Sequence, residues 1–92
     1  MIKTFRCKDT AALFNRLRSP RFQSIENVAR RKLVMLNNAQ SLRDLRVPSG
    51  NRLEELGGNR QGQHSIRIND QWRVCFVWGR RDAYEVEIVD YH

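Results

Sequence analysis

Residues 60–78 read Arg-Gln-Gly-Gln-His-Ser-Ile-Arg-Ile-Asn-Asp-Gln-Trp-Arg-Val-Cys-Phe-Val-Trp. Apolar and polar side chains alternate on both sides of a short polar break at residues 69–71. Alternation with a period of two puts successive side chains on opposite faces of a strand. The segment therefore predicts an antiparallel β-hairpin. Its apolar side chains are Ile66, Ile68, Trp72, Val74, Phe76 and Trp78.

The register of this hairpin follows from its apolar face. A two-residue turn at Asn69-Asp70 would place Ile66 opposite Arg73 and mix the two faces. A three-residue loop that also includes Gln71 instead pairs Ile66 with Val74. Because the buried face sets the register of a hairpin, we predict the three-residue loop.

The other face of the hairpin then has Arg67 directly opposite Arg73. Like charges that face each other across a ladder are unfavourable by about 0.2–1 kcal/mol. Such a pair is explained if both guanidinium groups point at an anion. Two solvated arginines, screened from each other by water, explain it equally well.

Length and composition predict one domain over residues 1–92, with a single modest core. No apolar run approaches the roughly 20 residues of a membrane span, and the first residues lack a signal-peptide pattern. Cys7 and Cys75 lie far apart in the sequence and match no metal-binding spacing. A cytoplasmic protein without disulfides is the simplest interpretation.

Basic residues are concentrated in the first half of the chain. Residues 1–46 contain eleven Lys/Arg and three Asp/Glu, whereas residues 47–92 contain six and seven, for a net charge of +7. A strongly basic small domain suggests a polyanionic partner, either nucleic acid or an acidic protein segment. The adjacent Arg30, Arg31 and Lys32 fit two interpretations, an RNA-binding rim or the solvated face of a helix.

The order of the elements predicts an α+β domain, with helices packed on one face of a small, mainly antiparallel sheet. That arrangement covers Ile66 and Val74 and leaves the face with Arg67 and Arg73 open. The predicted elements are a strand at Ile2–Phe5, helices at Thr10–Arg18 and Ile25–Ala39 with N-caps Asp9 and Ser24, a helical turn at Ser41–Arg46, a loop at 47–51, a polar turn at 79–82 and a strand at Tyr84–Val89.

The last three residues, Asp90-Tyr91-His92, all have side chains capable of proton transfer. Imidazole titrates near neutrality, so His92 suits an acid or a base. On a regular strand Asp90 and His92 face one side and Tyr91 the other, so a shared site requires the strand to end by about Val89. An ordinary polar tail is the alternative.

Other sites are weakly indicated. Arg52 and Arg60 flank the entrance to the hairpin and would serve either as phosphate ligands or as solvated charges. His64 shares the parity of Ile66, which favours a packed or edge histidine over a catalyst. The histidines and cysteines do not form a metal-binding set, and the sequence has no phosphate-binding loop.

Taken together, the sequence resembles the HigB toxins, within the RelE/ParE superfamily of bacterial toxin–antitoxin systems. The resemblance spans the whole chain, including its Asp-Tyr-His end. The residues that carry it are Arg52-Leu53, Leu56-x-Gly-Asn-Arg60, Gly62-x-His-Ser-Ile-Arg67, Trp72-Arg73-Val-Cys-Phe76 and Glu87-Ile-Val-Asp-Tyr-His92.

The resemblance implies a microbial RNase-like fold and a ribosome-dependent mRNA endonuclease, or mRNA interferase, that needs no metal or other cofactor. In that reaction the ribose 2′-hydroxyl attacks the adjacent phosphate and leaves a 2′,3′-cyclic phosphate and a 5′-hydroxyl. The implied partners are a HigA-like helix-turn-helix antitoxin, mRNA, and the 30S decoding site with its rRNA. Operator DNA would be bound only through the antitoxin complex, and no membrane is involved.

Carried over by position, Arg73 matches the family's phosphate-stabilising arginine, and Asp90, Tyr91 and His92 match its C-terminal site residues. His92 or Asp90 is assigned to proton transfer, and Tyr91 to the substrate base, because aromatic rings commonly stack on splayed RNA bases. Arg67 as a second phosphate ligand rests on the hairpin register alone.

The sequence departs from well-studied relatives at two positions of the expected site. Glu54 stands where they carry a histidine, and Gly57 where they carry a lysine. Glu54 remains a candidate base, but the site has one cation fewer, so we expect a weaker nuclease. Two alternatives stay open: a non-nucleolytic ParE-like toxin that acts on DNA gyrase, and a basic RNA- or protein-binding module.

Overall fold

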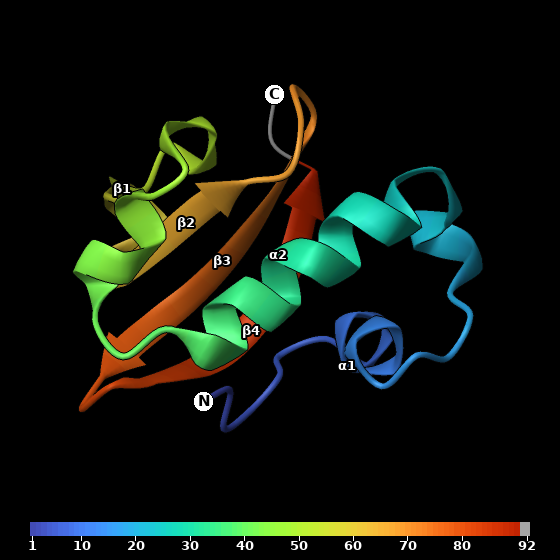
Figure 1. Ribbon diagram of the computed structural model, residues 1–92, viewed down its shortest axis with the longest axis horizontal. Coiled ribbons are helices and arrows are strands. Elements are labelled where there is room, and N and C mark those ends of the chain that lie inside the picture. The colour runs from blue at the N-terminus through green and yellow to red at the C-terminus, as the bar shows by residue number, and fades with distance from the viewer. Residues whose placement is uncertain (91–92) are drawn as a thin grey trace.

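A computed structural model describes residues 1–90, so Tyr91 and His92 lie outside the described part of the chain. Its centre is a four-stranded sheet in the order β1-β2-β3-β4, in which every neighbouring pair is antiparallel (Figure 1). The strands are β1 (Glu54–Glu55), β2 (Gln63–Arg67), β3 (Trp72–Gly79) and β4 (Asp82–Asp90). The hairpin predicted from the alternating stretch is the β2–β3 pair.

The hairpin has the predicted register. Ile66 pairs with Val74, and Arg67 pairs with Arg73. The side chain of Asn69 closes the three-residue loop, because its Oδ1 accepts hydrogen bonds of 2.8 Å from the backbone N–H groups of both Gln71 and Trp72. Asparagine commonly stabilises turns in this way, by bonding to backbone groups two or three residues further along the chain.

Strands β3 and β4 are joined by the predicted polar turn. Arg80 and Arg81 have φ values of 50° and 70°, the two positive values of a tight hairpin turn whose twist matches its strands. A bulge at Glu85 (φ 52°) then shifts the register between Cys75 and Val77. Strand β4 continues to Asp90, so the prediction of an end by about Val89 was wrong: Asp90 still pairs with Trp72.

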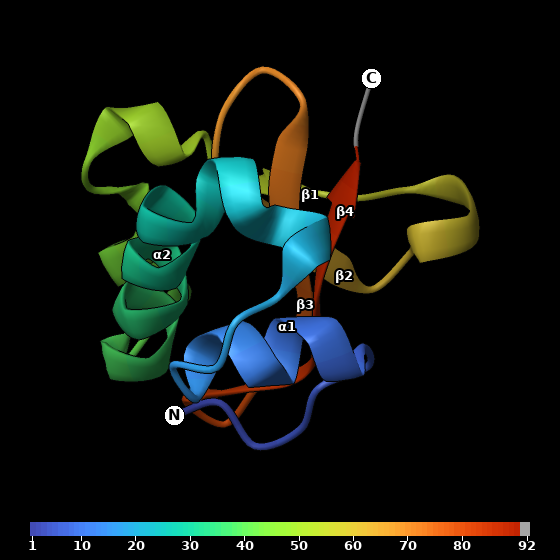
Figure 2. The same ribbon diagram turned by 90° about the vertical axis from the view of Figure 1, so that its right-hand side faces the viewer.

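Two α-helices and a 3₁₀ turn lie on one side of the sheet, as Figures 1 and 2 show. They are α1 (Lys8–Phe14), η1 (Pro20–Ile25) and α2 (Glu26–Asn38). Helix α1 ends four residues earlier than predicted, since Arg16 adopts φ 65° and cannot continue it. Neither predicted N-cap caps a helix, because α1 already begins at Lys8, before Asp9, and Ser24 lies inside η1, which Pro20 begins.

The core lies between these helices and the apolar face of the hairpin. Within it Phe22 meets Trp72 edge to face, with the ring centroids 5.5 Å apart. Burying apolar side chains at about 25 cal/mol per Å² is the main stabilising contribution to the fold. The most deeply buried residues include Leu13, Phe22, Ala29, Leu33, Leu36, Leu45, Ile66, Val74, Phe76, Val86 and Ile88.

The N-terminal segment predicted as a strand reaches the sheet without forming a continuous one. Ile2 and Phe5 make isolated parallel bridges to Ala83 and Val86 of β4. Thr4 lies between them, and its Oγ1 accepts a 2.8 Å hydrogen bond from the backbone N–H of the bulged Glu85. The segment therefore supplies a partner for a backbone group that the bulge removes from the ladder.

The chain between α2 and β2 wraps from the helical layer to the other face of the sheet. It contains the 3₁₀ turns η2 (Leu42–Arg46), η3 (Ser49–Asn51) and η4 (Gly58–Arg60), together with β1. A capping box formed by Ser41 and Asp44 begins η2. Within residues 1–90, no helix is long and apolar enough to cross a membrane.

Candidate functional site

The face of the sheet turned away from the helices carries a row of polar side chains. Residues paired across neighbouring strands point to the same side. Glu54 of β1 pairs with Ser65, Ser65 with Cys75, and Cys75 with Glu87, so these four share this outer face. Arg67 lies two residues beyond Ser65 on β2, and its ladder partner Arg73 lies two residues from Cys75 on β3, so both share this face too.

Arg73 is the central group on the outer face. Its Nε donates to Ser65 Oγ over 2.8 Å, and its Nη2 donates to the backbone carbonyl of Arg52 over 2.7 Å. Its Nη1 lies 3.9 Å from Glu54 Oε1. The expectation that Arg73 stays on an open face was wrong, because the residue is only 7% exposed beneath the Arg52–Glu54 segment. The result is a guanidinium held in one orientation.

The backbone of Arg52 makes this contact possible. Arg52 follows η3 with φ 44° and ψ 56°, a left-handed conformation. A non-glycine residue held in that region costs on the order of 1–3 kcal/mol and is found most often at functional sites. Here the conformation turns the Arg52 carbonyl toward Arg73 while the Arg52 side chain remains exposed.

A pocket of about 280 Å³ opens beside Arg73. Three of the residues that line it are arginines and two are carboxylates, so the lining has a net charge of +1 if all are ionised. Guanidinium groups bind phosphate oxygens through paired N–H donors. The lining residues are Arg52, Glu54, Arg67, Asn69, Asp70 and Arg73.

Arg67 enters the pocket with a partner that the sequence interpretation missed. Its Nη2 forms an ion pair with Oδ1 of Asp70, three residues further along the hairpin loop. Asp70 is 98% exposed, so solvent screens this pair strongly and an incoming anion can compete with it. The sequence could have indicated this ion pair, because Arg67 and Asp70 are three residues apart across the predicted turn.

Glu54 lies in the pocket as the sequence position suggested. Its side chain is 51% exposed, so the carboxylate is accessible while it stays within 4 Å of a buried cation. A carboxylate beside a phosphate site is repulsive unless a cation compensates it, and Arg73 supplies that compensation. The geometry is thus compatible with a base next to a phosphate ligand.

Arg60 was expected at the same site, but the structure places it elsewhere on the outer face. Its Nη1 donates to Gln63 Oε1 over 3.1 Å and to Glu87 Oε1 over 2.9 Å, and Arg60 does not line the pocket. Beneath this ion pair, burial raises the pKa of the Cys75 thiol, opposed in part by the charge of Arg60. Arg60 therefore fixes η4 onto the sheet.

Asp90 points to the opposite side of the sheet from Arg73. It pairs with Trp72, whose side chain faces the helical layer, and its Oδ2 accepts a 3.1 Å hydrogen bond from Gln71 Nε2. Tyr91 and His92 lie outside the described residues. The structure therefore brings Arg52, Glu54, Arg67 and Arg73 together and does not bring Arg60 or Asp90 to them.

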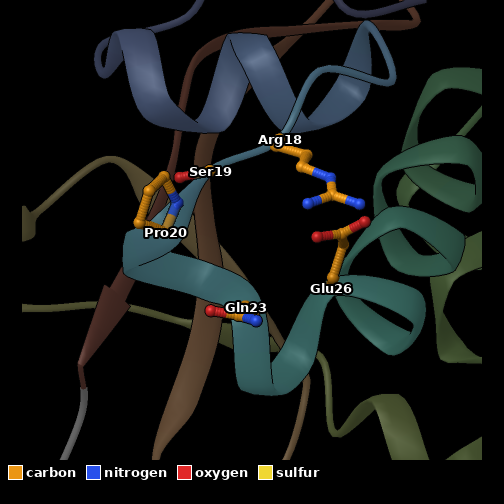
Figure 3. Close-up of a pocket in the computed structure, with 5 residues that line it drawn as sticks. All are labelled: Arg18, Ser19, Pro20, Gln23 and Glu26. Carbon is orange, nitrogen blue, oxygen red and sulfur yellow. The ribbon is translucent and has the colours of Figure 1, made fainter.

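A second recess, of about 290 Å³, lies on the helical side, where η1 leads into α2. Figure 3 shows Arg18 and Glu26 pointing toward each other across it, with Ser19, Pro20 and Gln23 along the wall. Arg18 is the single cationic residue among those that line this recess, and it faces the carboxylate of Glu26, so the recess is poorly suited to bind an anion. Among residues 1–90, no three His, Cys, Asp or Glu side chains are grouped so as to hold a metal ion.

Comparison with solved structures gives the class of protein. The YoeB-YefM complex from Staphylococcus aureus matches all of this chain and 98% of its own chain, with a TM-score of 0.58 and 17% sequence identity. At that identity the likeness shows a shared fold. Together, this fold and the arginine-lined pocket define a small α+β domain with a cationic pocket on the outer face of its sheet.

Comparison of sequences gives the family. Residues 5–92 match the HigB-like toxins, described as RelE-like toxins of the type II toxin–antitoxin system HigB, and the chain belongs to this family. A segment of 55 residues is 54% identical to Toxin HigB-1 of Vibrio cholerae serotype O1. This match covers 60% of this chain and 58% of the length of that relative. The resemblance to the HigB toxins inferred from the sequence is thereby confirmed.

Proposed function

We propose that this toxin is a ribosome-dependent mRNA endonuclease. The observation that carries the proposal is Arg73, a nearly buried guanidinium oriented by Ser65 and the Arg52 carbonyl at the wall of an arginine-lined pocket. Holding a cation in place before the substrate arrives is the most effective way to stabilise charge that develops in a transition state. RNA cleavage at a phosphate is the chemistry that needs such a cation.

The proposed reaction is an internal transesterification. The 2′-oxygen bonds to phosphorus as its proton passes to a base, and the bond from phosphorus to the 5′-oxygen breaks as that oxygen receives a proton from an acid. The products are a 2′,3′-cyclic phosphate and a 5′-hydroxyl. Arg73 and Arg67 would contact the non-bridging oxygens, where negative charge builds up.

Glu54 is the candidate base, and His92 is the candidate acid by family resemblance. Strand β4 ends next to Arg73, since Val89 is the ladder partner of Arg73, and Tyr91 and His92 follow Asp90 in the sequence. Asp90 faces the helical side of the sheet, away from Arg73, and the assignment of proton transfer to His92 rests on the family resemblance alone. Tyr91 is proposed to stack on a substrate base.

The proposed partners are an antitoxin, the ribosome and mRNA. The family is defined by a toxin–antitoxin system, and the structural neighbour is a complex of YoeB with YefM. A HigA-like helix-turn-helix antitoxin is therefore proposed for this chain, with operator DNA bound only through the antitoxin complex. The basic residues concentrated in positions 1–46 suit contacts with rRNA phosphates at the 30S decoding site.

Translation of a defined message tests this function. The purified toxin is added to the message alone and to the message with ribosomes, and the new 5′ ends are mapped. Cleavage that occurs only with ribosomes is the expected result. An intact message together with impaired DNA supercoiling in a gyrase assay would support the ParE-like alternative, and no effect in either assay would support a binding module.

Changing Glu54 tests its role as the base. Glu54→Gln should lower the single-turnover cleavage rate by about 10²-fold, the usual contribution of general-base catalysis, while Glu54→His should retain or increase the rate. The matched control is Glu55→Gln, because the neighbouring Glu55 pairs with His64 and points to the other side of β1. Equal rates for Glu54→Gln and Glu55→Gln would remove Glu54 from the mechanism.

A further inference from the structure

A buried polar side chain, Asn51, connects the helical layer to the pocket. It is 0% exposed, and both ends of its amide are occupied. Its Nδ2 donates to the Leu45 carbonyl over 3.1 Å and contacts Met35 Sδ at 3.0 Å, while its Oδ1 accepts a 2.5 Å hydrogen bond from Lys32 Nζ. A polar group buried in this way is tolerated because its hydrogen bonds are satisfied.

Lys32 belongs to the adjacent basic residues of α2, but it differs from its neighbours. Arg30 donates to the Leu13 carbonyl and pairs with Glu26, and Arg31 is exposed. Lys32 is half-buried and reaches Asn51, and burial, with a smaller contribution from the charge of Arg31, lowers its pKa. The interpretation of these residues as one RNA-binding rim therefore does not fit Lys32.

Asn51 is the last residue of η3 and directly precedes Arg52. The backbone N–H groups of Asn51 and Arg52 donate to the carbonyls of Pro48 and Ser49, which closes the turn. The carbonyl of Arg52, the residue that follows Asn51, accepts the hydrogen bond from Arg73. A continuous set of contacts thus leads from Lys32 through Asn51 and the left-handed Arg52 to Arg73.

We propose that Lys32 and Asn51 are positioning residues, which fix the Arg52 carbonyl and through it the orientation of the Arg73 guanidinium. The expected effect on the cleavage rate rests on the proposed function, whereas the positioning of the Arg73 guanidinium does not. Catalytic groups must be held within about 0.5 Å of their productive geometry, and a displacement of roughly 1 Å can reduce a rate by about 10²-fold. Lys32 lies on α2, on the far side of the sheet from the pocket.

The test compares Lys32→Met with Lys8→Met in the whole toxin. Both variants remove one lysine charge, but Lys8 is exposed at the start of α1 and makes no contact with this network. Lys32→Met should lower kcat of ribosome-dependent cleavage by roughly tenfold, with KM changed less than about threefold, since substrate binding groups remain. Lys32→Arg, which keeps a donor near Asn51, should recover most of the rate.

Hydrogen exchange of the Arg73 Nε–H group, followed by NMR, gives a readout independent of activity. Lys32→Met should accelerate this exchange by roughly tenfold relative to the Val74 backbone N–H, which serves as the reference for global unfolding. If Lys32→Met does not fold, Lys32→Ala replaces it, because alanine also removes the donor to Asn51 and has a high helix propensity. Lys8→Met should leave both exchange rates unchanged.

Each outcome decides between the proposals. Unchanged Arg73 exchange together with an unchanged kcat in Lys32→Met would overturn the positioning role. Equal acceleration at Arg73 and Val74 would also overturn it, since it would show a purely structural effect. If the wild-type toxin cleaves no message, the proposed function fails, whereas faster Arg73 exchange in Lys32→Met would still support the positioning of the guanidinium.

Discussion

Replacing Arg73 by methionine is expected to reduce ribosome-dependent cleavage by about 10²–10³-fold and to abolish growth inhibition. The physical reason is the loss of a cation that is already oriented by Ser65 and by the Arg52 carbonyl. Methionine keeps much of the aliphatic length, so the outer face loses charge with little loss of volume. The measurement is the single-turnover rate on programmed ribosomes, with growth after induction as the second readout.

Two further variants separate charge from geometry at this position. Arg73→Lys retains the charge, but an ammonium cannot reproduce the fixed fork that reaches both Ser65 Oγ and the Arg52 carbonyl, so most of the activity should still be lost. Arg80→Met, in the exposed turn between β3 and β4, is the control. An Arg73→Met variant that is folded and fully toxic would remove Arg73 from the mechanism.

Replacing His92 by glutamine is expected to have the second-largest effect. Removing a group that transfers a proton in the transition state costs typically 10²–10⁴-fold, and we expect a loss of about 10²-fold in the cleavage rate. Deletion of His92 should act similarly, because both changes remove the imidazole. The rate is measured under single turnover, so that binding to the ribosome does not limit it.

Asp90 provides the comparison for His92. Asp90 pairs with Trp72 and faces the helical side, away from Arg73, so Asp90→Asn should cost much less than His92→Gln. A larger loss for Asp90→Asn than for His92→Gln would reverse the assignment of the proton-transfer role. Equal and unchanged rates for both variants would exclude the C-terminal residues from the chemistry.

The hairpin was predictable because its pattern is local and redundant. One register buries the whole apolar set, and a shift by one residue would place Arg73 in the core. The same argument placed Arg67 opposite Arg73, and the structure has this pair. Helix α2 was predictable from a local pattern too, because apolar residues recur along it every three or four positions, and Ala29, Leu33 and Leu36 of this set are all buried.

The environment of Arg73 was not predictable from a local pattern. Its burial depends on a two-residue edge strand, β1, and on a left-handed arginine at position 52. Neither feature has a sequence signature, because edge strands this short show no alternation and glycine is the residue expected at a left-handed position. Tertiary contacts, not propensity, determine both.

The pairing of charges was the other feature that sequence alone left open. Arg67, from the hairpin register, and Arg60, from its place at the hairpin entrance, were both candidates for phosphate binding. The structure pairs Arg60 with Glu87 across the outer face and Arg67 with the exposed Asp70. Glu87 lies 27 positions from Arg60, so only the strand register brings the two together. The burial of Lys32 against Asn51 likewise depends on the path of the loop after α2.

The toxin is proposed to cleave mRNA by attack of a ribose 2′-hydroxyl on a phosphate held by Arg73. The most direct test replaces that single hydroxyl by hydrogen in a synthetic message, at the nucleotide before the mapped cleavage point. We expect cleavage of the all-ribose message to a 2′,3′-cyclic phosphate end, identified by mass, and no cleavage of the 2′-deoxy message at that point. Cleavage of the 2′-deoxy message at the same point, or an all-ribose product ending in a 3′-hydroxyl, would contradict it.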